Sequence, residues 1–167
     1  MIFKNLTKVF FINLLFISLI FITDRISKIY VIYLNDRSLN SEIFSSKFLN
    51  ISLIWNEGIA FGLFSFDQSN LYNFITIIIL IIILIIFRMM TNSASFKRYS
   101  LMMIFGGAIG NLYDRIFFGA VPDFIDFHVK EFHWFIFNVA DIFITIGVFF
   151  MILFELIDAN KDNHENI

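Results

Sequence analysis

The sequence predicts an all-α membrane protein in which four transmembrane helices carry a small extramembrane β-rich cradle, all within one integral membrane domain covering residues 1–167. Three observations lead to this prediction. The chain is 59% hydrophobic with 25 Phe and one Pro, a composition far from that of soluble proteins. Its apolar runs approach the roughly 17 to 25 residues that a helix needs to cross a bilayer. Polar stretches separate these runs, which places the spans at about 6–23, 71–90, 99–118 and 135–157 and the cradle at about 35–70.

Composition also narrows the chemistry. The net charge is −2 and the charges lie between apolar segments instead of forming a basic patch, so we expect no nucleic-acid partner. The chain has no cysteine, which excludes disulfides, a thiol nucleophile and thiolate metal ligands. Any catalysis must therefore come from oxygen or imidazole groups.

The first span resembles a signal peptide, because two lysines precede the apolar run Val9 to Ile22. No small-residue cleavage site follows, so we expect an uncleaved transmembrane helix. Asp24 and Lys28 come next at i,i+4 spacing and can face each other on a continuing helix. This spacing fits either an ion pair that anchors the helix end at the interface or a role near a functional site.

The polar segment 35–70 contains two short apolar runs, Phe48 to Trp55 and Ile59 to Phe66, separated by Asn56, Glu57 and Gly58. β-Branched and aromatic residues favour strands, and Asn-X-Gly is typical of a turn. We therefore expect a strand pair outside the membrane. The turn alone is enough to explain why asparagine is at position 56.

The second span is the least ambiguous, because 71–90 contains the run FITIIILIIILIIF without a charge. The third span, 99–118, is interrupted by glycines, and Gly106 and Gly110 form a small-xxx-small pair that lets another helix approach closely. A loop is expected over 119–134, followed by the fourth span.

Four spans place both termini on one side of the membrane. Lys and Arg are denser in 1–8 and 88–98 than in the polar segments on the other side, so the termini are predicted to be cytoplasmic. The polar stretch 106–141 then opens on the outer face.

The third span carries Asn111, Asp114 and Arg115 at i, i+3 and i+4, which puts them on one helix face. We expect an ion pair there with an amide beside it. Asp123 follows eight residues after Arg115, in the expected loop, close enough to fold back onto the helix end.

The fourth span repeats this pattern with Asn138, Asp141 and Thr145 at i, i+3 and i+7. If Asp123 and Asp141 approach each other, two like charges cannot both ionise easily, and the pair would share one proton as in aspartic proteases. Other acids lie nearby, namely Asp114, Asp126 and Glu131. Spacing alone therefore leaves open a proteolytic pair, a proton or ion relay, and a structural polar cluster.

A metal site could be drawn from Asp123, Asp126, His128 and His133. Their spacing, D-x-x-D-x-H-x4-H, matches no established ligand pattern. We therefore predict no metal ion at these residues.

Four sequence blocks together resemble the bacterial lipoprotein signal peptidases, the signal peptidase II family. They are TDRISK at 23–28, WNEGIAFGLF at 55–64, GGAIGNLYDR at 106–115 with VPDFIDF at 121–127, and FNVAD at 137–141. The blocks occur in the family's order and span residues 23–141, which is most of the chain. The GNLYDR, DFIDF and FNVAD set between four spans is the specific part of the resemblance.

The resemblance implies a multi-pass aspartic endopeptidase of the bacterial inner membrane, and nothing in the sequence demands more than a monomer. Such an enzyme removes the signal peptide of a prolipoprotein embedded in membrane lipid, cleaving just before a cysteine that bears a diacylglyceryl group, without metal or cofactor. By motif, Asp123 and Asp141 are the catalytic pair. Further matching positions bind substrate or support the pocket: Asn56, Asn111, Arg115, Asn138, Asp24, Lys28 and Asp114. Pro122 departs from the Val or Ile of the family pattern, and it fixes φ and removes an N–H just before Asp123.

Overall fold

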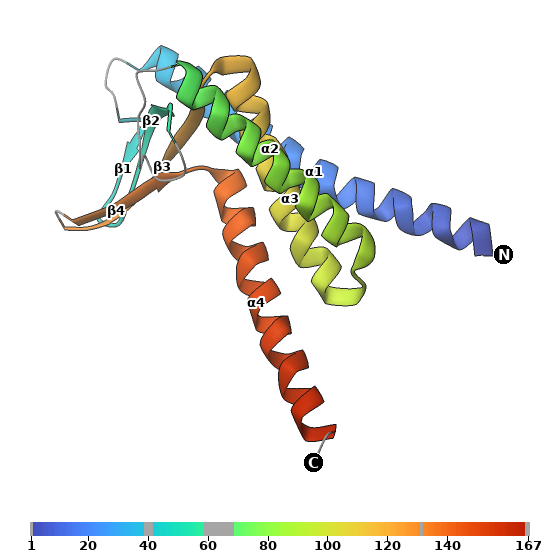
Figure 1. The fold of residues 1–167 in the computed structure, drawn as a ribbon. Helices are drawn as coiled ribbons and strands as arrows, with labels where there is room; N and C mark the ends of the chain where they lie inside the picture. The colour runs from blue at the N-terminus through green and yellow to red at the C-terminus, as the bar shows by residue number, and fades with distance from the viewer. Residues whose placement is uncertain (1, 39–41, 59–68, 131, 166–167) are drawn as a thin grey trace.

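The computed structural model describes residues 2–38, 42–58, 69–130 and 132–165. Within them the protein is mostly helical, with four helices and one four-stranded antiparallel sheet (Figure 1). The helices are α1 (Ile2–Arg37), α2 (Ser69–Asn92), α3 (Ser95–Phe118) and α4 (Val139–Glu165). The strands are β1 (Phe44–Ser45), β2 (Leu49–Asn56), β3 (Val121–Val129) and β4 (Phe132–Phe137), and they lie in that order across the sheet.

Helix α3 is the central helix, because it contacts α1, α2 and α4. The predicted close approach at its glycines is confirmed. A Cβ added to Gly110 would lie 2.7 Å from Oδ2 of Asp24 on α1, and one added to Gly106 would lie 3.0 Å from the Ile20 side chain. The glycines therefore let α1 pack directly against α3 at the level where the polar residues lie.

Three of the described helices are long and apolar enough to cross a membrane, at Val9–Arg37, Tyr72–Asn92 and Val139–Asp158. Two helix ends differ from the predicted span bounds. Helix α1 continues past 23 through its charged residues to Arg37, and the fourth helix starts at Val139 instead of 135 because 132–137 form a strand. Helix α3 contains the predicted span 99–118, but its charged residues and glycines lower its mean hydropathy, so it is not among the three helices named above.

The sheet draws on more of the chain than predicted. The segment 35–70 supplies β1 and β2, and the expected run Ile59 to Phe66 lies outside the described residues. The expected loop 119–134 is instead the β3–β4 hairpin. Strand β4 pairs with β3 only from Ile125 onward, so at Pro122 strand β3 has β2 alone beside it, a position that tolerates proline.

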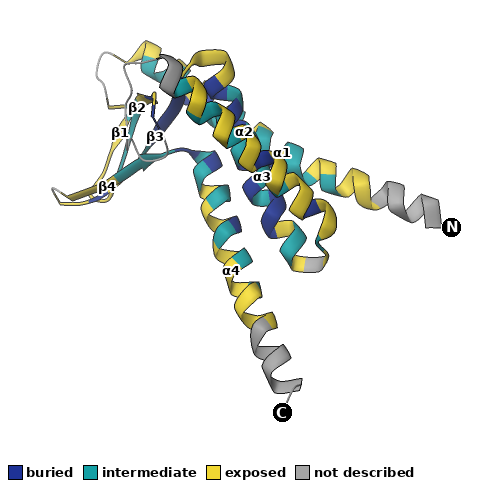
Figure 2. Ribbon diagram, viewed as in Figure 1, coloured by how far each residue is buried: buried dark blue, intermediate teal, exposed yellow. Residues whose placement is uncertain are grey.

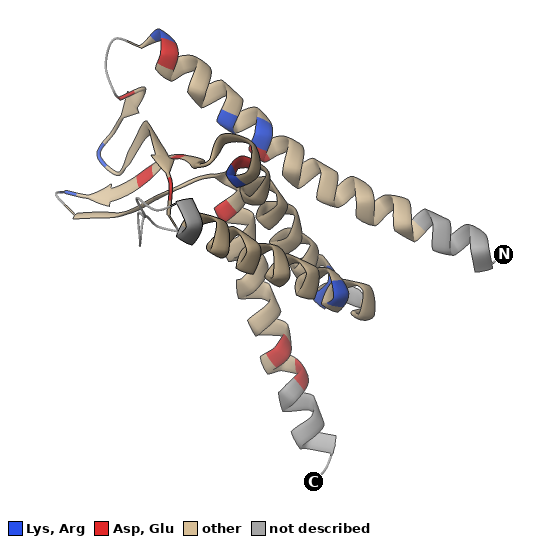
Figure 3. Cartoon of the chain, turned by 45° about the horizontal axis from the view of Figure 1, so that its top comes forward, with Lys and Arg blue, Asp and Glu red and all other residues tan. Residues whose placement is uncertain are grey.

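The sheet lies at one end of the helix bundle, and the far ends of α1 and α4 point away from it (Figure 1). Many residues along α1, α2 and α4 are exposed (Figure 2), and large apolar residues are prominent among them. Charged residues gather where α1 passes the sheet end of α3, and again near the α2–α3 turn and along the later part of α4 (Figure 3). Apolar helix surfaces between two polar levels are typical of a protein that spans a bilayer.

Candidate active site

Asp123 lies on β3 and not in a loop, so its position is set by strand pairing. It is opposite Ile54 of β2, and it is only 4% exposed. Two amide groups donate to its carboxylate: Asn56 Nδ2 to Oδ2 at 2.8 Å and Asn138 Nδ2 to Oδ1 at 2.6 Å. Burial raises the pKa of Asp123 to about 6; the charge of Asp141 also raises it, whereas the two amide donors lower it. This carboxyl group is therefore poised to exchange a proton near neutral pH.

Asp141 lies in the first turn of α4, and a capping box holds it there. Asn138 is the residue before the helix; its Oδ1 accepts the N–H of Asp141 at 3.2 Å, and Asp141 Oδ2 accepts the N–H of Asn138 at 3.1 Å. This reciprocal pattern satisfies backbone donors that a helix start leaves free. Asn111 Nδ2 on α3 donates to the other carboxylate oxygen at 2.8 Å. The N-terminal end of the helix also favours a negative charge at this position.

Asn138 joins the two acids. Its side chain is fully buried, and it bonds to Asp123 through Nδ2 and to Asp141 through both Oδ1 and its backbone N–H. Asn138 thus lies between a carboxylate from a strand and another from a helix, and it hydrogen-bonds to both. The predicted meeting of Asp123 and Asp141 at one site is consistent with this geometry.

Asn56 combines the two roles that the sequence left open. Its Oδ1 accepts the N–H of Gly58 at 2.9 Å, which closes the turn, and its Nδ2 donates to Asp123. The Asn56 side chain therefore both closes the turn and donates a hydrogen bond to the buried Asp123.

A buried ionic network lies behind the two acids, between α1 and α3. Lys28 is 1% exposed, and its Nζ donates to Asp24 at 2.9 Å, Asp114 at 2.7 Å and Asn111 at 2.9 Å. The predicted i,i+4 pair of Asp24 and Lys28 is confirmed. Asp24 Oδ1 also accepts the N–H of Ala140 at 3.0 Å. The network thereby fixes Asn111 and the start of α4, the two elements that hold Asp141.

The prediction of an ion pair between Asp114 and Arg115 was wrong. Asp114 pairs with Lys28 and with Arg25, whose Nη2 lies 2.6 Å from Oδ2. Arg115 instead donates to the carbonyl oxygens of Gly58 at 3.1 Å and Asn111 at 3.3 Å. Adjacent residues differ by about 100° around a helix, so Asp114 faces α1 while Arg115 faces the turn after β2.

Arg25 is the network residue that sequence reasoning did not include among the site residues. It lies in the TDRISK block between Asp24 and Lys28, which was the available signal. Its partner Asp114 is 89 positions away on another helix, so the pairing itself is not visible in local spacing.

A cavity of about 420 Å³ opens beside Asp141. Its lining is almost entirely apolar and comes from the β3–β4 hairpin and the first turns of α4. It consists of Phe127, Trp134, Phe135, Phe137, Asp141, Ile142, Thr145 and Ile146. Asp141 and Thr145, which were predicted to share a helix face, both lie on this cavity. It can accept an apolar group next to a carboxylate.

The four residues considered for a metal site do not come together as one set. Asp123 is bonded to the amides of Asn56 and Asn138, whereas Asp126, His128 and His133 cluster farther along the β3–β4 hairpin.

A helical membrane scaffold, a buried Asp123 and a half-buried Asp141 joined by an amide residue, and an adjoining apolar cavity are features expected of a membrane-bound aspartic peptidase. Comparison with known proteins identifies the particular group. The model of the family described as Signal peptidase (SPase) II matches residues 16–157. The chain therefore belongs to the signal peptidase II family of aspartic peptidases, and it has lipoprotein signal peptidase activity.

The relatives are similar over nearly their whole lengths. A lipoprotein signal peptidase of Pelagibacter ubique (strain HTCC1062) is 56% identical over 158 residues, which is 95% of each chain. One from Anaplasma marginale (strain Florida) is 40% identical over 87% of this chain and 84% of its own. A bacterial membrane enzyme solved by the in meso method at 2.3 Å resolution superposes with a TM-score of 0.70 at 34% identity, covering 89% of this chain and 90% of that one. The protein is accordingly a multi-pass bacterial membrane enzyme, and among the three functions left open by spacing the family membership selects the peptidase.

Proposed function

We propose that Asp123 and Asp141 are the catalytic pair and that the substrate is a prolipoprotein, cleaved just before a cysteine that bears a diacylglyceryl group. The observation that carries the assignment is the position of Asn138, which hydrogen-bonds to both acids. No other pair of acids in the described part of the site is joined in this way beside an apolar cavity. The family's aspartic chemistry requires two such groups.

The environments of the two acids suggest separate roles. Asp141 lies at the positive end of α4 and accepts a backbone N–H, which favours the carboxylate and suits a general base. Asp123 is buried on a strand, and its pKa, raised to about 6, keeps more of it protonated near neutral pH than an ordinary aspartate, which suits a general acid. Because the groups interact, the observed pKa values belong to the pair.

In the first step, Asp141 accepts a proton from water, the resulting hydroxide adds to the scissile carbonyl carbon, and Asp123 gives its proton to the carbonyl oxygen. The tetrahedral diol then collapses as one hydroxyl returns its proton to Asp123 and Asp141 protonates the departing amine, which breaks the C–N bond. Asn56, Asn111 and Asn138 hold the two carboxyl groups in place. No step requires a metal ion or a cofactor.

The substrate-facing roles follow from the remaining polar groups and the cavity. Arg115 is 7% exposed and its Nε has no hydrogen-bond partner among the described residues, so it can donate to a substrate carbonyl. The cavity beside Asp141 has the apolar lining and volume for part of an acyl chain or an apolar signal-peptide side chain. Asp24, Lys28 and Asp114 support the site through Asn111 and Ala140.

For the membrane placement, we propose that α3 also spans the membrane, which makes four spans in a single domain, and that α1, α2 and α4 enclose it and shield its polar residues from lipid. Arg88, Lys97 and Arg98 lie near the α2–α3 turn, at the end of the bundle away from the sheet (Figure 3). The positive-inside rule then puts this turn and both termini in the cytoplasm, and the β-sheet cradle and the site at the outer face of the inner membrane. One copy supplies every proposed site residue, so a monomer suffices.

Purified enzyme tests this proposal with two matched precursors, one carrying a diacylglyceryl cysteine and one with the same cysteine unmodified. We expect cleavage of the lipidated precursor alone, at the bond before the cysteine, as mapped by mass spectrometry. Asp123→Asn and Asp141→Asn should abolish cleavage while the protein stays folded in the membrane. Full activity in either variant rejects the pair, and equal cleavage of both precursors rejects the lipid requirement.

A further inference from the structure

The β3–β4 hairpin carries a cluster of two imidazoles and a carboxylate that the peptidase chemistry does not use. We propose that Asp126, His128 and His133 bind a divalent first-row transition-metal ion such as Zn²⁺ or Cu²⁺. One ligand atom from each residue lies within 4.8 Å of the other two. The cluster is separate from Asp123, whose oxygens are bonded to Asn56 and Asn138.

Strand geometry explains why these residues meet. Asp126 and His128 are two positions apart on β3, so their side chains project from the same face of the sheet. His133 on β4 is paired in register with His128, and the two imidazole rings have centroids 5.0 Å apart. The pattern D-x-H on one strand opposite H on the next therefore places three ligands on one face, although the linear spacing resembles no known motif.

Unpartnered buried atoms point to a ligand at this position. Asp126 is 5% exposed and His128 is 9% exposed, yet Asp126 Oδ1 and His128 Nδ1 are buried without a hydrogen-bond partner among the described residues. Only the second carboxylate oxygen of Asp126 is bonded, to His133 Nδ1 at 2.8 Å. Buried polar groups in folded proteins are normally paired, and a metal ion would coordinate both of these atoms.

The donor set and its spacing suit such an ion. Two imidazoles and one carboxylate with an open position form a common donor set for Zn²⁺ and other borderline transition metals. Metal–ligand bonds of about 2.0 to 2.1 Å place tetrahedral ligand atoms roughly 3.3 Å apart, so the cluster needs to contract by about 1.5 Å at most. The exposed His133 side chain, at 53%, gives an ion and a coordinating water access from solvent.

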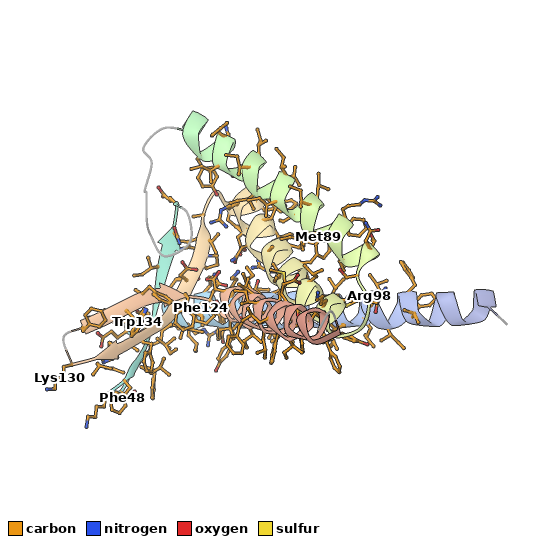
Figure 4. All side chains as sticks on the ribbon, turned by 60° about the horizontal axis from the view of Figure 1, so that its bottom comes forward. Phe48, Met89, Arg98, Phe124, Lys130 and Trp134 are labelled. Carbon is orange, nitrogen blue, oxygen red and sulfur yellow. The ribbon has the colours of Figure 1, made fainter. Side chains whose placement is uncertain are left out.

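The location separates this site from the proposed catalytic pair. Lys130 at the hairpin turn and Trp134 on β4 lie at the end of the sheet away from the helices, whereas Phe124 lies near them (Figure 4). A bound ion would link β3 to β4 within the hairpin that also supplies Phe127, Trp134, Phe135 and Phe137 to the cavity. Metal binding should therefore stiffen one wall of the cavity.

The test uses the full-length protein in detergent, titrated with Zn²⁺ by calorimetry and with Cu²⁺ by electron paramagnetic resonance. We expect one ion per chain and nitrogen hyperfine coupling from two imidazoles. His128→Ala, His133→Gln and Asp126→Asn should each weaken binding by at least about tenfold, since even residues around a metal's ligands contribute that much. His133 is exposed, so His133→Gln removes a ligand without disturbing buried packing.

The chain's third histidine, His164, provides the matched control, because it lies outside the cluster and His164→Ala should bind metal as the unchanged protein does. Thermal unfolding without added metal checks that each variant is folded. Zn²⁺ should raise the unfolding temperature of the unchanged protein and of His164→Ala, but not of His133→Gln. Absence of stoichiometric binding, or binding that His128→Ala and His133→Gln leave unchanged, overturns the proposal.

Discussion

Replacing Asn138 by alanine tests how the two acids are held. The fully buried side chain donates to Asp123 at 2.6 Å and caps α4 by accepting the N–H of Asp141 at 3.2 Å. Loss of a helix N-cap costs about 1 kcal/mol. Loss of a hydrogen bond to a charged group costs about 1.5 to 3 kcal/mol. Asn138→Ala should therefore lower the free energy of unfolding by roughly 2.5 to 4 kcal/mol.

The effect on catalysis follows from the same bonds. If positioning of Asp123 loses about 1.5 to 3 kcal/mol in the transition state, kcat/KM should fall about 10- to 150-fold. The pH profile should change as well. Asn138 lowers the pKa of Asp123, so its removal raises that pKa further above its ordinary value. Because Asp123 acts in its protonated form, the alkaline limb of kcat/KM, expected near pH 6, should move to higher pH.

The assay is cleavage of a lipid-modified precursor by purified enzyme from about pH 5 to about pH 9, together with denaturant unfolding. Asn138→Ser is the matched control, because serine still caps the helix but is too short to reach Asp123. It should be more stable than Asn138→Ala by about 1 kcal/mol and should show the same shift of the alkaline limb. Wild-type kcat/KM with an unshifted limb in Asn138→Ala would refute the bridging role.

Two further predictions concern the support behind the site. Lys28→Met removes the lysine shared by the buried Asp24 and Asp114, which keep Arg25 as a counterion, and should destabilise the protein by about 1.5 to 3 kcal/mol, measured by unfolding in mixed micelles. Lys97→Met, at an exposed ion pair, should change stability little, and equal effects of the two substitutions would contradict the distinction. Gly110→Ala puts a Cβ 2.7 Å from Asp24 Oδ2 and should cost about 1 to 3 kcal/mol together with much of the cleavage rate. Gly119→Asn is the control and should be tolerated, since Gly119 faces open space and asparagine adopts its positive φ of 70° readily. Wild-type stability and cleavage rate in Gly110→Ala would contradict the close-packing interpretation.

Local spacing was sufficient for features that lie within one helix or at its start. The i,i+4 pair of Asp24 and Lys28 and the close approach at Gly110 were predictable because helical periodicity fixes them. The capping box of Asn138 and Asp141 also follows an N-x-x-D pattern at a helix start, although we expected that helix to begin at 135.

Features that depend on distant segments were not predictable in this way. The sequence after Gly119 was expected to be a loop, although Ile125 and Phe127 alternate with Asp126 and His128 as in a strand. Pro122 obscured that signal, because proline is uncommon inside a strand. The partner of Asp114 also lies on another helix, so no local pattern distinguishes Arg25 from Arg115 as its counterion.

The most direct test of the central claim is the single-turnover rate of cleavage for Asp123→Asn, Asp141→Asn and the double variant, each folded in lipid with the same lipidated precursor. If the two acids work as one catalytic unit, each single substitution removes nearly all of the rate and the double variant is no slower than the slower single variant. A single variant that retains the wild-type rate, or losses that multiply in the double variant, would contradict the claim.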